Sequence, residues 1–307
     1  MLASIVAAPV HRLPAVGAKC VHFRDYCPAA TATRRKRKID GDPRSLGNNP
    51  RNGVHGLLLR AICFRTSAAV TQLDRSRLSA KAARAANSSS DRFLHERALE
   101  DCLDRLHSMP GELGQVAIVG YPATEDVAHR ISNAKSVEPF TLESIEPECA
   151  DVVIAVGAID HAEDPAIAAF ILRHSLRPGG RLIGATIGSG SLARMRRAFL
   201  DAERAAGRAA RRFHPMPDPA SLSTMLSGSG LSDVVIDVDG FNVRYSSLDH
   251  LVRDLRSMGC TSSLAGAVPP LHRSIYEDAR HHFSAGADRV DERFEILHFS
   301  GVAKMKV

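Results

Sequence analysis

Hydrophobic residues recur every three or four positions through residues 90–106. Leu94, Leu99 and Leu106 fall on one side of a helix with 3.6 residues per turn, and polar residues occupy the other side. The pattern therefore predicts an amphipathic helix in this segment. Pro110, followed by glycine, ends it.

Short apolar runs follow and alternate with helical patterns. The predicted strands are 115–120, 136–138, 151–156 and 181–186, and the predicted helices between them are 124–132 and a segment from Pro165, capped by Asp164. The alternation is typical of an α/β fold with a doubly wound, mostly parallel sheet. Ligands of such sheets bind outside the carboxyl ends of the strands, so we expect the site on the loops after Val119, Val137, Val156 and Thr186.

The pattern changes in the last third of the chain. It predicts helices at 192–212, 221–227 and 247–258, and strands at 233–238, 241–245 and 293–303. Asp239-Gly240 is a typical hairpin turn and is expected to join the strands on either side of it. The sheet therefore ends in an antiparallel C-terminal pair.

Composition sets the first 71 residues apart from the rest. They contain 12 Lys and Arg against 3 Asp, including the run 34–38, whereas residues 72–307 contain 28 basic and 31 acidic side chains. We expect residues 1–71 to form a disordered basic tail and residues 72–307 to form one domain. A mitochondrial transit peptide and a nuclear or nucleic-acid patch are alternative interpretations of the tail. The mildly acidic domain argues against nucleic acid as a partner.

Apolar runs and cysteines narrow the class of protein further. No apolar run approaches the roughly 20 residues that a transmembrane segment needs. The six cysteines form no C-x-x-C pair and no spacing typical of a metal site, so we expect no metal and a reducing compartment. The cytoplasm is the expected location, and the mitochondrial matrix is the alternative if the tail is a transit peptide.

Three stretches resemble one protein family. Residues 184–192 (GATIGSGSL) resemble a G-A-x-x-G-G-D-T-L stretch, residues 252–259 (VRDLRSMG) an M-x-D-L-x-x-M-G helix, and residues 294–301 (FEILHFSG) a terminal F-E-I-x-Y-x-x-G-W strand. The three patterns are typical of the methyltransferase-like assembly factors of respiratory complex I, a family within the class I S-adenosylmethionine (SAM)-dependent methyltransferase superfamily. The chain therefore resembles that family. The resemblance covers residues 72–307. It implies a Rossmann-like fold, SAM as cofactor and methyl transfer, although mitochondrial relatives hydroxylate arginine and a neighbouring family methylates malonyl groups.

The resemblance also indicates which residues would hold SAM. The D-L-G-C-G pattern after the first strand falls on residues 118–122, where Gly120 is retained but Ile118 replaces the acid and Pro122 replaces the second glycine. The SAM motif is therefore degenerate. Glu138 is the expected ribose-binding acid, because it follows Gly120 by 18 residues at the predicted end of a strand, although an exposed loop acid is an equal alternative. Val156 ends the central strand and completes the expected cofactor site.

The connection that follows the second strand is short. Only 12 residues separate Glu138 from Asp151, too few for a helix and a further strand. The resemblance implies that the missing strand is the third of the fold, which lies at one edge. We therefore expect a sheet with a trimmed edge, and an exposed second strand.

The expected catalytic residues follow the central strand. The family's H-W-V-N-D falls on residues 160–164, which places Asp160 and His161 beside the acceptor as an acid and base. Alternatives are an exposed loop pair and, for His161 with Glu163, half of an iron-binding triad. The acceptor is a small molecule or a protein, and arginines on the predicted helix 192–212 suit a docking partner. The rival hypothesis is a docking module for complex I with little or no cofactor affinity.

Overall fold

The computed structural model describes residues 73–86, 92–120, 125–160, 162–265 and 269–304. The strands are β1 (Gln115–Gly120), β2 (Ser136–Phe140), β3 (Ala150–Val156), β4 (Leu176–Ile187), β5 (Leu231–Tyr245) and β6 (Val290–Ala303). The helices are α2 (Arg75–Ala86), α3 (Phe93–His107), α4 (Glu125–His129), α5 (Pro165–Ser175), α6 (Ala193–Ala205), α7 (Pro219–Gly228), α8 (Leu248–Ser257) and α9 (Arg273–Ser284).

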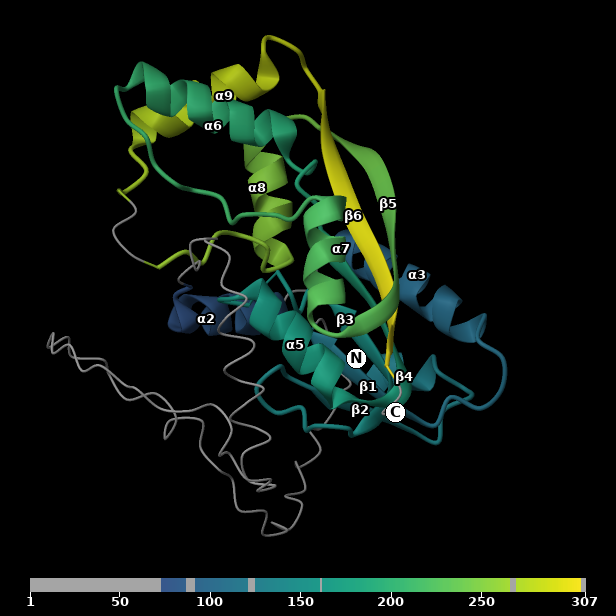
Figure 1. Ribbon diagram of the computed structural model, residues 1–307. Coiled ribbons are helices and arrows are strands. Elements are labelled where there is room, and N and C mark those ends of the chain that lie inside the picture. Colours follow the sequence, from purple (N-terminus) through teal and green to yellow (C-terminus); the bar gives the residue numbers. More distant parts are fainter. Residues whose placement is uncertain (1–72, 87–91, 121–124, 161, 266–268, 305–307) are drawn as a thin grey trace, which may run out of the picture. The chain divides into compact units, whose positions relative to one another are not determined.

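All six described strands form one sheet in the order β2-β1-β3-β4-β6-β5 (Figure 1). The first four are parallel, and β6 runs antiparallel to both β4 and β5. This confirms the predicted doubly wound α/β fold with an antiparallel C-terminal pair. The trimmed edge is confirmed as well, because β2 is outermost and residues 141–149 contain neither a strand nor a helix.

Helices cover the sheet on both faces. Residues of α5 and α7, such as Leu172 and Leu226, pack on one face with Phe299 of β6. Residues of α3, such as Leu99 and Leu106, pack on the other face. Strands β1 and β3 are buried on both faces, which explains why their sequences are continuously apolar.

A third cluster joins α6, α8 and α9 to the end of β5 and the start of β6, where Tyr245 and Phe294 take part (Figure 1). The helix predicted at 192–212 ends earlier, at Ala205, and Gly207 follows it with a left-handed φ of +64°. The helix predicted at 124–132 also proves shorter and comprises only α4. Helices α2 and α9 were not predicted.

The predicted hairpin at Asp239-Gly240 is wrong. Residues 231–245 form the single strand β5, which pairs with β6 from Leu231 to Tyr245. Gly240 lies opposite Glu295 inside this ladder. The Asp239 carboxylate accepts a hydrogen bond from Arg97 Nη2 at 3.0 Å, so long-range pairing replaces the local turn.

Candidate functional site

The carboxyl ends of the parallel strands β1 and β3 lie side by side where the strand order reverses. From β1 the chain crosses to β2 on one side, and from β3 it crosses to β4 on the other. Gly120 and Val156 are partners in the register at this point. A doubly wound sheet opens a crevice at such a switch point, because the connections leave it on opposite faces. The two predicted residues therefore lie together, at the position where this fold binds ligands.

Gly120 adopts a conformation that other residues rarely reach. Its φ is +98°, and a Cβ atom there would lie 2.1 Å from the carbonyl oxygen of Val156. The end of β1 can therefore lie directly against β3 only because residue 120 has no side chain. Tyr121 and Pro122 lie outside the described residues, so the effect of the changed motif on the loop stays a prediction.

Asp160 connects the loop after β3 to the end of β4. Its Oδ1 accepts hydrogen bonds from the Thr186 hydroxyl and, at 3.2 Å, from the Ile187 N–H. These contacts hold the carboxylate at the rim of the sheet, at the end of β4. His161, the other predicted catalytic residue, lies outside the described residues. Asp164 caps α5 as predicted, since Oδ1 accepts from the Ala166 N–H at 2.9 Å.

Two residues that the sequence analysis did not select lie close to this rim. Cys260 follows α8, and its sulfur is 3.9 Å from His95 Nε2 on α3. Burial, with a smaller contribution from the charge of Asp160, raises the pKa of the Cys260 thiol to about 12. A thiol with that pKa stays protonated and is a poor nucleophile. No sequence signal relates these residues, because they are 165 positions apart in the chain.

Helix α2 packs against the loops at the same rim. The Lys81 ammonium donates to the Thr261 carbonyl at 3.0 Å, to Ser263 Oγ at 3.1 Å and to the Ser262 carbonyl. Arg75 Nε lies 3.0 Å from Glu163 Oε1, three residues after Asp160. Residues 75–86 therefore link the loop after α8 to the loop after β3.

Glu138 does not lie at the end of its strand, which corrects the prediction. Strand β2 continues to Phe140, and Glu138 pairs with Ala117, three register positions before Gly120. Three strand residues span about 10 Å, so the carboxylate is well away from the switch point. The strand is longer than predicted because Pro139 and Phe140 continue the pairing with β1.

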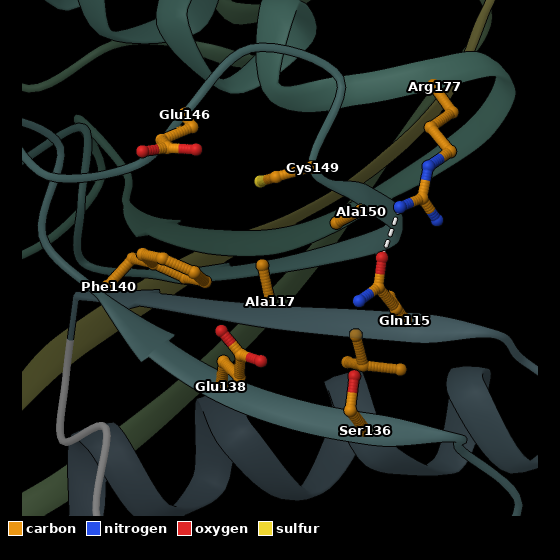
Figure 2. Close-up of a pocket in the computed structure, with 10 residues that line it drawn as sticks. Gln115, Ala117, Ser136, Glu138, Phe140, Glu146, Cys149, Ala150 and Arg177 are labelled. Carbon is orange, nitrogen blue, oxygen red and sulfur yellow. Dashed lines mark hydrogen bonds between the residues drawn. The ribbon is translucent and has the colours of Figure 1, made fainter. Parts of the chain in front are cut away.

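Glu138 instead lines a separate cavity of about 380 Å³ (Figure 2). The cavity lies between the face of β1 and β2 and the connection that leads to β3. Its lining residues are Gln115, Val116, Ala117, Ser136, Glu138, Phe140, Glu146, Cys149, Ala150 and Arg177. Within the parts of the chain that the structure describes, no group of three or more His, Cys, Asp and Glu side chains is arranged for a metal ion.

Comparisons with known proteins identify methyltransferases among similar sequences. No protein-family model matches the chain. It is 24% identical over 149 residues to malonyl-[acyl-carrier protein] O-methyltransferase 1 of Coxiella burnetii, which is 48% of this chain and 50% of that protein. It is 30% identical over 114 residues to the malonyl-[acyl-carrier protein] O-methyltransferase of Xylella fastidiosa, which is 37% of each. The chain thus spans half or less of the length of these curated relatives.

Similar solved structures come from the same class of proteins. A protein of Bacillus halodurans named for methyltransferase activity is 13% identical, with a TM-score of 0.44, over 67% of this chain and 99% of that one. Phosphoethanolamine N-methyltransferase 2 of Haemonchus contortus, in complex with S-adenosylhomocysteine, is 12% identical with a TM-score of 0.38, over 67% of this chain and 52% of that one.

Within the described ranges, none of the helices combines the length and the apolar character that crossing a bilayer requires.

Proposed function

We propose that this protein is a methyltransferase that uses SAM and binds it at the carboxyl ends of β1 and β3. The observation that carries the proposal is the switch point, where the left-handed Gly120 lies against the end of β3 beside Val156. The similarity to two O-methyltransferases over 114 and 149 residues supports the same class of reaction.

The described residues fit one end of SAM better than the other. Main-chain groups of Gly120 and Val156 would bind its methionine moiety, because the glycine lets the end of β1 lie directly against β3 at the switch point. Bound SAM supplies an electrophilic methyl group on a sulfonium. Asp160, held by Thr186 and Ile187, would orient an acceptor at the rim, and with His161 would take its proton. Glu138 is not assigned to the ribose, because of its register position.

Calorimetric titration of the full chain with SAM and with S-adenosylhomocysteine tests the proposal. We expect a dissociation constant in the micromolar range for each. Heat of dilution alone, up to millimolar ligand, would contradict the proposal. That result would favour the rival hypothesis, in which the fold serves as a docking module.

A finer proposal concerns the acceptor and the setting. The resemblance of residues 184–192, 252–259 and 294–301 supports a role close to that of the complex I assembly factors, with a protein acceptor or a respiratory complex subunit as partner. The named relatives support a malonyl-type acceptor instead. Incubation with radiolabelled SAM and each class of acceptor separates the two, since only the true acceptor gains label. Location in the cytoplasm or the mitochondrial matrix stays a prediction.

A further inference from the structure

The cavity beside β2 is distinct from the switch point. Its lining includes residues 115–117 of β1, Ala150 at the start of β3, Arg177 near the start of β4, and Ser136, Glu138 and Phe140 of β2. Apart from Phe140, which ends β2, these strand positions precede the carboxyl ends where SAM is proposed to bind. The cavity lies at the trimmed edge, where residues 141–149 connect β2 to β3 without a strand or a helix. It is thus a second concave site, whose lining does not include Gly120, Val156 or Asp160.

The cavity carries a net negative charge. Its one arginine, Arg177, is already engaged, because Nη1 lies 2.7 Å from Asp151 Oδ2 and Nη2 donates to Gln115 Oε1 (Figure 2). Glu138 and Glu146 line the other part of the cavity. Among the described residues, neither carboxylate has a hydrogen-bond or ion-pair partner. Two acceptors are therefore available for a cation that enters from outside.

The remaining walls suit an aliphatic chain. Phe140, Ala117 and Ala150 contribute apolar surface, and the Cys149 thiol lies between this surface and Glu146 (Figure 2). Lysine and arginine side chains combine an apolar stem with a cationic end, so they match apolar walls next to carboxylates. The shape and charge of the cavity thus complement a basic side chain.

The edge strand also indicates how such a partner would approach. Strand β2 is outermost in the sheet, but Pro139 has no N–H to donate to an added strand. Binding of a partner by adding a strand to the edge of the sheet is therefore disfavoured. Insertion of a side chain of the partner into the cavity agrees better with this edge. We propose that this cavity receives a lysine or arginine side chain from a basic segment of a protein partner.

The Cys149 thiol reports occupancy of the cavity directly. The test measures alkylation of Cys149 by iodoacetamide at pH 8.5 in the full chain, quantified on the peptide that contains it by mass spectrometry. The probe is the synthetic peptide acetyl-(Ala-Arg)4-amide. We expect saturating peptide to slow alkylation of Cys149 at least threefold, and added salt to weaken this protection.

Matched variants identify the carboxylates responsible. We expect protection to be lost in the double variant Glu138→Gln with Glu146→Gln, and to persist in Glu138→Asp with Glu146→Asp. Glu100→Gln, which changes an exposed glutamate on α3, should be protected like the unaltered chain. Circular dichroism checks that each variant is folded, and the Asp variant keeps the test decisive if the Gln variant unfolds.

Three outcomes would overturn the proposal. One is equal protection by acetyl-(Ala-Glu)4-amide, and another is protection that survives in the Gln double variant. The third is protection by free spermine equal to that by the arginine peptide at the same charge concentration, which would assign the cavity to a small polyamine. The proposal does not rest on methyl transfer, because SAM binding is measured separately by calorimetry.

Discussion

At Gly120 the absence of a side chain decides how closely two strands approach. A methyl group there would lie 2.1 Å from the Val156 carbonyl oxygen, and the residue would keep a φ of +98° that disfavours any Cβ. We predict that Gly120→Ala lowers the free energy of unfolding by about 3 kcal/mol, from backbone strain and the clash together. It should also weaken SAM binding at least tenfold. Urea unfolding and calorimetry measure the two effects.

Gly111 provides the matched control. Its φ is +85°, but an added Cβ would meet nothing within 4 Å. Gly111→Ala should therefore cost only the strain of the left-handed backbone, about 1 kcal/mol, and leave SAM binding unchanged. Equal losses of stability in the two variants would show that the contact with Val156 has no consequence.

Local residue roles were predictable, whereas contacts between distant residues were not. Asp164 caps α5 by accepting from N–H groups two and three residues away, so its role can be predicted from the adjacent sequence. The approach of Cys260 to His95 joins residues 165 positions apart, and no periodicity encodes it. Glu138 falls between these cases, because its strand was predicted but the end of that strand depends on pairing with β1.

At the scale of elements, the predicted strands and turns are wrong where pairing between distant strands overrides a local sequence signal. Asp239-Gly240 is a strong hairpin signal, yet β5 continues through it because β6 offers a partner along its whole length. The buried parallel strands β1 and β3 were found because burial on both faces makes their sequences continuously apolar. Helix α2 has a single apolar side chain larger than alanine, Leu78, so its pattern is weak.

Lys81 is one of the residues that attach helix α2 to the rim. The ammonium donates to three oxygens of residues 261–263, and burial lowers the pKa of Lys81. We predict that Lys81→Met, which keeps the apolar stem but removes the donors, destabilises the attachment by about 1–2 kcal/mol. Amide hydrogen exchange in residues 75–86, followed by mass spectrometry, should become several-fold faster.

Lys135→Met is the control for this element. Lys135 is exposed, and its nearest carboxylate oxygen, on Glu112, is 3.9 Å away. Removing this exposed pair should leave exchange in residues 75–86 unchanged. Unchanged exchange in Lys81→Met as well would mean that the hydrogen bonds of Lys81 do not hold α2 at the rim.

At the scale of the whole molecule, charged side chains connect α3 to the antiparallel end of the sheet. Arg105 Nη1 lies 2.7 Å from Asp237 Oδ2 on β5, and Arg105 Nε lies 2.5 Å from Asp101 Oδ2 on α3. His298 of β6 is buried beneath them, with Nδ1 2.9 Å from the same Asp101 oxygen. The charge of the Asp239 carboxylate on β5 also acts to raise the pKa of His298. The protonation of His298 is therefore coupled to these charges.

The pH dependence of stability follows from the balance at His298. Burial is the largest influence and lowers the pKa of His298, with help from Arg105, while Asp101, Asp239 and Asp237 oppose it. Burial prevails because the imidazole is 3% exposed, whereas the Asp101 carboxylate is 38% exposed and shared with Arg105. In the unfolded chain a histidine titrates near its ordinary pKa of about 6.5. Below that pH the unfolded chain therefore binds a proton that the folded protein resists.

We consequently predict that the free energy of unfolding falls as the pH drops from 7.5 to 5.5, with His298 contributing at most about 1.4 kcal/mol per pH unit below its unfolded pKa. His298→Gln should reduce this fall, because glutamine does not titrate, whereas His281→Gln, at an exposed position on α9, should not. Urea unfolding of the three proteins at each pH measures the difference. A stability that rises as the pH falls below 6.5, and does so only while His298 is present, would mean that attraction to Asp101 outweighs burial.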